Sequence, residues 1–163
     1  MHGSSNLILR SDVNYDPVLA PMNGVGDTHI TANVSADNGQ INAGGANLYQ
    51  SQGELSTHGG VVATYANNIS LASFTAGGNV QLTAQSGNMT ASGRVSDAAS
   101  ALLLSGKDIQ LTGEYASTAV VDATGTAAVK GIFHQGLTIT STGDTALTDT
   151  TVSGLLDIHS AGQ

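Results

Sequence analysis

Cysteine and tryptophan are both absent from this chain of 163 residues, and aromatic residues make up only 4% of it. Without cysteine, the chain has neither a disulfide framework nor a CxxC metal site. Four residues are lysine or arginine against twelve acidic residues, which gives a formal net charge of −8 at pH 7. Because nucleic-acid phosphates are neutralised by clustered lysine and arginine, this composition excludes nucleic acid as an expected partner.

Long apolar runs are also missing. No stretch approaches the roughly 18 apolar residues that a membrane-spanning helix needs, and the N-terminus lacks the pattern of a secretory signal, so we expect no membrane insertion. Apolar residues also do not recur with helical spacing over the 10 or so residues of a typical helix. Hydrophobic residues nevertheless reach 40% of the chain. We therefore expect a core of small aliphatic side chains without helices.

A repeat of about 20 residues dominates what is present. One apolar series recurs at intervals of 20, and the members of this first structural ladder are Ile69, Met89, Ile109 and Val129. A second series recurs at intervals of 18 to 21, and its members are Val61, Leu82, Leu102, Val121, Ile139 and Ile158. Self-similarity at a fixed period is typical of a solenoid, in which each repeat stacks on its neighbours.

The residues between the ladder positions indicate strands. Short alternations of apolar and polar residues, such as 80–83, 109–112 and 137–140, are bounded by glycine and small polar residues. Such segments are too short and too rich in glycine for helices, and the leucine/asparagine signature of a leucine-rich repeat is missing. The sequence therefore predicts an all-β fold, a right-handed parallel β-helix with a period of about 20 residues. Asn68, Asn88 and Asp108 precede the first ladder and are predicted to stack as a turn ladder.

The domain organisation follows from the same repeat. Residues 30–163 have room for six or seven coils, and we expect this domain to be a fragment of a longer chain, because open solenoid ends expose strand edges. Residues 1–29 do not follow the repeat and contain both prolines, Pro17 and Pro21. They are expected to be an irregular cap or loop, with 6–9 as a candidate strand. The first five residues have the look of an expression-tag remnant.

One recurrent motif resembles a known family. The order glycine, Asx, apolar, any residue, apolar, Thr/Ser and Ala/Gly occurs at 78–84 and, more loosely, at 107–113. It is similar to the filamentous haemagglutinin repeats of two-partner secretion exoproteins in Gram-negative bacteria. These exoproteins include adhesins, haemolysins and contact-dependent growth inhibition effectors. The Asn-Pro motifs of that family's secretion domain do not occur here, which favours the central shaft.

The resemblance implies a secreted or cell-surface fibre with roles in cell adhesion and virulence. Its implied partners are an outer-membrane transporter of the two-partner type and a glycan or protein receptor on a host or neighbouring cell. A β-helical passenger segment of an autotransporter would have the same architecture and is the alternative. The Asn-x-Ser/Thr sequons at Asn33, Asn68 and Asn88 are also what the repeat itself generates, so glycosylation there is left open.

No catalytic, cofactor-binding or metal-binding residue is predicted. The five histidines show no HExxH or HxH spacing, so no metal site is expected. A third hypothesis, a pectin-lyase-like carbohydrate-active enzyme, needs clustered carboxylates and a base on one face of the solenoid. The residues best suited to it are Asp108, Asp122 and Lys130. We do not expect an enzyme, because the acidic residues are spread singly along the chain.

Overall fold

The computed structural model describes residues 6–10 and 26–162, and it contains two parallel β-sheets. The first sheet consists of eight strands: β1 (Leu7–Arg10), β4 (Ile41–Gly45), β7 (Val61–Tyr65), β9 (Val80–Ala84), β11 (Ala101–Gly106), β13 (Thr118–Ala123), β15 (Gly136–Ser141) and β17 (Leu155–Ser160). The second sheet consists of nine: β2 (Asp27–Ile30), β3 (Val34–Ala36), β5 (Asn47–Gln50), β6 (Leu55–Thr57), β8 (Ile69–Ala76), β10 (Met89–Val95), β12 (Ile109–Tyr115), β14 (Ala127–Phe133) and β16 (Thr145–Val152).

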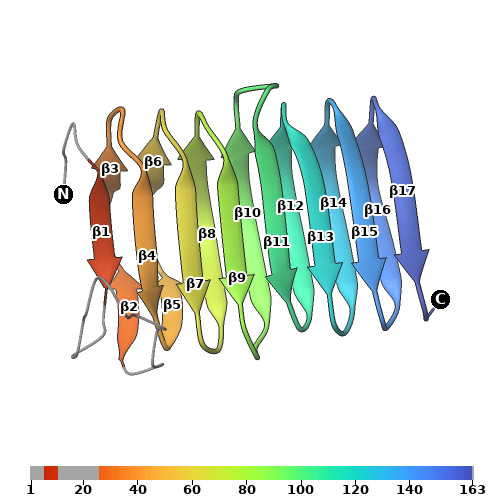
Figure 1. The fold of residues 1–163 in the computed structure, drawn as a ribbon, viewed down its shortest axis with the longest axis horizontal. Coiled ribbons are helices and arrows are strands. Elements are labelled where there is room, and N and C mark those ends of the chain that lie inside the picture. The colour runs from red at the N-terminus through yellow and green to blue at the C-terminus, as the bar shows by residue number, and fades with distance from the viewer. Residues whose placement is uncertain (1–5, 11–25, 163) are drawn as a thin grey trace.

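The chain alternates between these sheets, so that each coil contributes to both. Figure 1 shows the two sheets as facing layers, with the strands side by side along the long axis and the last strand, β17, at one end. Successive strands within each sheet pair in parallel, and the stack has about 7 turns with a period of about 19 residues. The predicted parallel β-helix is therefore confirmed. Within the described residues there is no helix long and apolar enough to cross a membrane.

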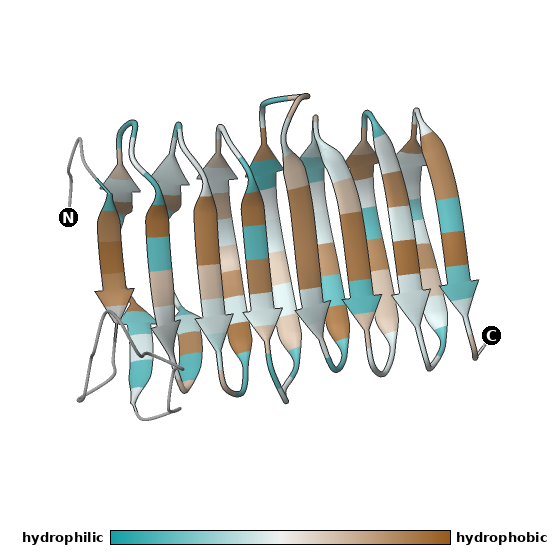
Figure 2. Ribbon diagram, viewed as in Figure 1, coloured by the Kyte–Doolittle hydropathy of each residue, from teal (hydrophilic) through white to brown (hydrophobic). Residues whose placement is uncertain are grey.

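The core lies between the two sheets and is made of alternate residues from each strand. Figure 2 shows hydrophobic and hydrophilic residues alternating along strands such as β9 and β17. In β7 the burial pattern alternates between buried and half-buried residues, as expected when side chains point to opposite faces. Most buried side chains are aliphatic, and the largest buried ones include four aromatic rings: Tyr65, Phe74, Tyr115 and Phe133.

The strands of the solenoid begin before residue 30, the predicted start of the repeat domain. β1 pairs in parallel with β4, and β2 pairs in parallel with β5, so both are members of the sheets. The candidate strand at 6–9 corresponds to β1. The predicted tag remnant at 1–5 and both prolines of the predicted loop lie outside the described residues.

The first predicted structural ladder is correct for three of its four members. Ile69, Met89 and Ile109 are aligned on β8, β10 and β12. Val129 does not continue this row, because Ala127 pairs with Ile109 and Val129 pairs with Leu111. The coil that follows Ile109 is shorter than the two before it. A fixed interval of 20 from Ile109 therefore passes Ala127 and reaches Val129, the next inward-facing position on β14. Val129 stays buried because inward-facing positions alternate along a strand.

The second predicted ladder combines two neighbouring rows. Leu82, Val121, Ile139 and Ile158 belong to one row, in which Leu104 is the β11 member. Leu102 belongs instead to the row of Val61 and Val80. The coil from Val61 to Val80 is shorter than the predicted interval of 21, so the series moves to Leu82 in the neighbouring row. The loop at 96–100, which projects between β10 and β11 in Figure 1, lengthens a later coil, so the series returns to the first row at Leu102.

Candidate functional surfaces

The predicted turn ladder runs along the edge where the chain enters the second sheet. Asn68 Oδ1 accepts a hydrogen bond of 2.9 Å from the backbone N–H of Asn88, and Asn47 Oδ1 accepts one of 3.0 Å from the N–H of Asn68. In the same coils the backbone carbonyl of Asn88 accepts from the N–H of Ile69. The carbonyl of Asp108 accepts in the same way from Met89. Asn68, Asn88 and Asp108 are therefore stacked, and Asn47 extends the ladder toward the N-terminus.

Asp108 replaces the amide of this ladder with a carboxylate. Its Oδ1 accepts hydrogen bonds from both the backbone N–H and the hydroxyl of Thr126, at 2.8 and 3.0 Å. These two bonds favour the ionised form, so they hold the pKa of Asp108 below its ordinary value. The carboxylate thus has the same structural task as the asparagines, which is to accept from the backbone of the next coil.

The three sequon asparagines all lie in turns that are hydrogen-bonded to a neighbouring coil. Asn33 Oδ1 accepts a hydrogen bond of 3.0 Å from the N–H of Glu54, while Asn68 accepts within the turn ladder as described. Asn88 stands at the next position of that ladder: its backbone N–H donates to Asn68 Oδ1, and its carbonyl accepts from the N–H of Ile69. Each asparagine is thus placed where the repeat needs it, so the sequons have a structural explanation.

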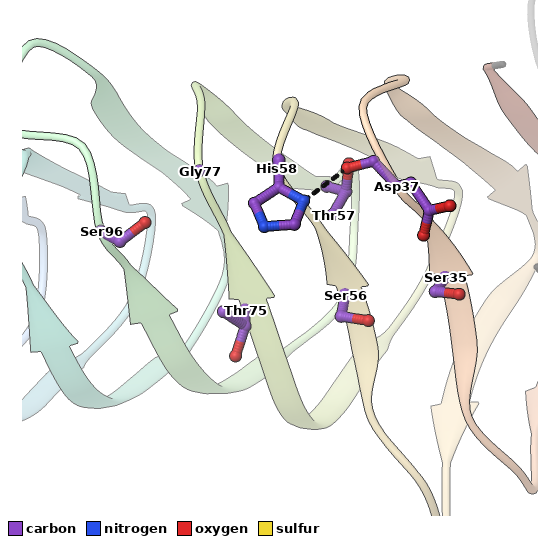
Figure 3. Close-up of a pocket in the computed structure, with 8 residues that line it drawn as sticks. All are labelled: Ser35, Asp37, Ser56, Thr57, His58, Thr75, Gly77 and Ser96. Atoms are coloured by element: carbon purple, nitrogen blue, oxygen red, sulfur yellow. Dashed lines mark hydrogen bonds between the residues drawn. The ribbon is translucent and has the colours of Figure 1, made fainter. Parts of the chain in front are cut away.

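A hydroxyl-lined hollow of about 200 Å³ lies over the N-terminal part of the second sheet. Figure 3 shows its lining: Ser35, Asp37, Ser56, Thr57, His58, Thr75, Gly77 and Ser96. Ser35, Ser56 and Thr75 are in register on β3, β6 and β8. His58 Nδ1 lies 2.8 Å from the backbone carbonyl oxygen of Asp37, which orients the ring along the turn. The Thr75 hydroxyl donates to the Glu54 carboxylate.

A larger hollow of about 390 Å³ lies on the outer face of the first sheet, beside the projecting loop. Its lining combines the amides of Gln40, Asn79 and Gln81 with the apolar side chains of Val62 and Leu103. Asn79 Oδ1 accepts a hydrogen bond of 2.9 Å from the N–H of Ala101, which fixes where the chain returns from the loop. Among the described residues, no charged side chain lines this hollow, so it can hydrogen-bond a neutral polar surface but supplies no general base.

The loop at 96–100 is held by its own side chains. Asp97 Oδ1 accepts a hydrogen bond of 3.0 Å from the N–H of Ala99, and Asp97 Oδ2 accepts one of 3.2 Å from the hydroxyl of Ser100. Because side-chain acceptors satisfy these donors locally, the chain can leave the regular coil and return to it. The loop therefore has a defined shape where it joins the two sheets.

The residues of the carbohydrate-active hypothesis are not brought together. Asp122 lies on β13 of the first sheet, and Lys130 lies on β14 of the second. The Lys130 ammonium pairs with the Asp149 carboxylate at 3.1 Å, and Asp108 sits in the turn ladder. No group of three metal-ligating side chains occurs among residues 6–10 and 26–162.

Sequence reasoning missed the bend within each coil of the second sheet, which we call the corner. Gly93, Gly113 and Gly131 are paired in register there. Gly113 has a φ of +146°, and a Cβ at this position would collide with the carbonyl oxygen of Gly93. The three glycines recur once per coil within the strands, and this recurrence is the signal in the sequence that marks the corner.

Comparison of the chain with family models, with curated proteins and with solved structures finds no match. Function is therefore inferred from the fold and from the residues of this chain.

Proposed function

We propose that this chain is a structural shaft segment of a large secreted bacterial adhesin, similar to filamentous haemagglutinin. The observation that carries the proposal is the solenoid itself, in which parallel strands repeat over about 7 turns. Such a fold suits a shaft or a passenger segment, because each added coil extends the rod without changing its cross-section. The recurrent Gly-Asx-apolar motif supports the haemagglutinin-like class.

The physical properties of the rod suit a spacer outside the cell. At roughly 4.8 Å per strand step, the stacked turns give a rod on the order of 30 Å long. Turns are joined by backbone bonds and by the turn ladder, so rigidity needs no disulfide. The net charge of −8 limits lateral adhesion between such rods. The shaft would hold binding or effector modules away from the surface.

The partners of the parent protein follow from this proposal. A two-partner outer-membrane transporter would export the chain to the surface of a Gram-negative bacterium. A glycan or protein receptor on a host or neighbouring cell would be contacted by attached modules. The amide-lined hollow beside Leu103 is the surface of this segment best suited to an additional weak contact with a neutral glycan.

Export tests the proposed class. The chain is fused behind a two-partner secretion domain and expressed with the matching transporter. We expect it to reach the surface of intact cells, measured by its accessibility to added protease. A Gly113→Val variant, which cannot form the corner, is the folding control and should be degraded on export. Retention of the folded wild-type segment inside the cell envelope would contradict the proposal.

Removal of one coil tests the role as a spacer. Deletion of residues 109–126 joins Asp108 to Ala127 and preserves the register, because Ala127 occupies the row of Ile109, and it spares every residue that lines the amide-lined hollow. We expect a folded rod that is shorter by about 4.8 Å, measured by small-angle X-ray scattering. Binding of the purified chain to glycan and host-cell surfaces is measured in parallel. Saturable binding that is lost on Gln40→Ala but kept on coil deletion would indicate a local adhesive site instead of a pure spacer.

A further inference from the structure

The amide-lined hollow exists because one side chain is missing from a row of the first sheet. Gln40, Gly60 and Asn79 stand at the same position of three successive coils, directly before β4, β7 and β9. A Cβ at Gly60 would lie 2.5 Å from the carbonyl oxygen of Asn79, so the close stacking of these coils requires glycine. Because glycine has no side chain, a gap remains between the side chains of Gln40 and Asn79, both of which line the hollow.

The amides around this gap have unused hydrogen-bonding capacity. Neither the side chain of Gln40 nor that of Gln81 forms a hydrogen bond with another described residue. Asn79 Oδ1 accepts from the N–H of Ala101, which leaves the Asn79 Nδ2 group as a donor. A primary amide has two donor hydrogens and one acceptor oxygen. The hollow is therefore surrounded by groups that can both donate and accept.

A second hollow of about 190 Å³ continues the first one along the rod. The two hollows share Gln81 and Leu103, which are paired in register on β9 and β11. We call them together the groove, which extends from Gln40 to Asp122. Figure 1 shows the strands concerned, from β4 to β13, side by side along the long axis. Four strand steps span roughly 19 Å, so a ligand that fills the groove is elongated and crosses the strands.

Apolar side chains lie between the polar groups of the groove. Val62 and Val120 are half-buried and Leu103 is 42% exposed, and all three share one outward-facing row with Gln81. Among the described residues, Asp122 is the only charged side chain that lines either hollow. The groove thus alternates amide and apolar surface and carries a single negative charge at one end.

A sugar chain has the matching chemistry. Each sugar hydroxyl both donates and accepts, as the amides do, and the C–H groups of the ring can pack on Val62 and Leu103. A peptide could not join this surface as an added strand, because β9 and β11 are each paired on both sides. We propose that the groove binds a neutral, linear oligosaccharide that lies along the rod. This inference rests on the proposed function, because a surface shaft would be exposed to the glycans of other cells.

Asp122 is the specificity-determining residue of this site. Its carboxylate, together with the net charge of −8, repels sugars that carry carboxylate or sulfate groups. Its place at the end of the groove leaves the amides around Gly60 available for neutral sugars.

Binding of defined oligosaccharides to the purified chain tests the site. The probes are neutral gluco-, manno- and galacto-oligosaccharides of two and four sugars, titrated by calorimetry. A tetrasaccharide should bind saturably and more tightly than its disaccharide, because only the longer chain reaches both hollows. Gln81→Ala should weaken tetrasaccharide binding about fivefold or more, because Gln81 lines both hollows. Gln110→Ala is the matched control, since Gln110 is exposed on β12 of the opposite sheet and its variant should bind normally.

An acidic probe tests the role of Asp122. The uronic-acid form of the tetrasaccharide should bind several-fold more weakly than the neutral form, and Asp122→Asn should reduce this difference without changing neutral binding. Circular dichroism verifies the fold of each variant. Absence of saturable binding by every neutral tetrasaccharide would overturn the proposal, as would equal weakening by Gln81→Ala and Gln110→Ala, or equal affinity for acidic and neutral forms. Because the purified chain needs no export, the site can fail in this test while the shaft proposal stands.

Discussion

The N-terminal and C-terminal coils of the second sheet form the same corner in different ways. In the N-terminal coils the strand is interrupted, as between β5 and β6, and the buried side chain of Gln50 fills the corner. Its Nε2 donates to the carbonyls of Gly53 and Ser73 at 2.9 and 2.8 Å, and its Oε1 accepts from the N–H of Ser73. In β10, β12 and β14 the strand is continuous, and a column of glycines occupies the corner.

This difference shows that a bent strand has to satisfy its backbone groups at the bend. Gln50 does so with an amide side chain, which needs room, and the coil from Leu48 to Ile69 is a long one. Glycine lets neighbouring backbones approach directly, and the coil from Ile109 to Ala127 is correspondingly shorter. Removing either device should therefore damage its own half of the rod more than the other half.

The largest effect is expected from Gly113→Ala in the C-terminal half. Its φ of +146° is strained for any residue with a Cβ, and that Cβ would meet the Gly93 carbonyl. We expect a loss of about 3 kcal/mol or more in unfolding free energy, measured by urea denaturation. Gly106→Ala is the control, because its added Cβ would have its nearest contact at 3.5 Å. Equal stability of the two variants would contradict the role of the glycine column.

A smaller effect is expected from Gln50→Met in the N-terminal half. Methionine keeps the volume but leaves the backbone groups of Gly53 and Ser73 without the Gln50 amide. The cost should be about 2 kcal/mol. Hydrogen exchange should show the loss of protection concentrated in β5, β6 and β8. The matched control is Gln110→Met on β12, where the side chain is exposed. A loss spread evenly along the rod would argue against independent corners.

Each half of the rod contains one buried tyrosine, so the loss of stability at alkaline pH can be compared between the two halves. Burial raises the pKa of Tyr65 to about 12, and it also raises the pKa of Tyr115 above the ordinary value near 10. The stability that each neutral phenol contributes is present below pH 10 and is lost as pH rises through the folded-state pKa. For Tyr65 the loss should be about 1.4 kcal/mol at pH 11.

Replacing each tyrosine by phenylalanine shows how much of the alkaline loss of stability comes from each half of the rod. Tyr65→Phe and Tyr115→Phe should each flatten the decline in melting temperature between pH 9 and 11. At pH 7, Tyr115→Phe should cost about 1 kcal/mol, because the Tyr115 hydroxyl donates to the Thr112 carbonyl at 2.7 Å. A decline that is unchanged in the double variant would show that other groups cause the alkaline loss.

The smallest effect concerns the turn ladder. The lowered pKa of Asp108 means that its contribution is present above pH 4 and is lost as pH falls below that value. Asp108→Asn should remove this acid dependence while keeping the acceptor for Thr126. Asn68→Ala tests the amide part of the ladder, because the Asn68 side chain accepts from the backbone N–H of Asn88, and melting curves at pH 3 and pH 7 measure both variants. An Asp108→Asn variant with undiminished acid sensitivity would exclude Asp108 as its source.

The sequence predicted which residues stack far better than it predicted their rows. Ile69, Met89 and Ile109 are aligned as expected, and the turn ladder of Asn68 and Asn88 carries its hydrogen bonds. Val129 and Leu102 were assigned to rows next to their own. Alternation with a period of two identifies which residues of a strand face inward, but it does not distinguish one inward position from the next. When coils differ in length, a fixed interval therefore assigns a residue to a neighbouring row.

What the sequence determined by itself is the fold class and the inward face of most strands, because alternation and glycine-bounded turns are local properties. Only the tertiary structure decided how the corner is filled and where the loop at 96–100 projects. Gln50 and Gly113 act through backbone groups one coil away. These features depend on contacts between coils, which an interval along the chain does not encode.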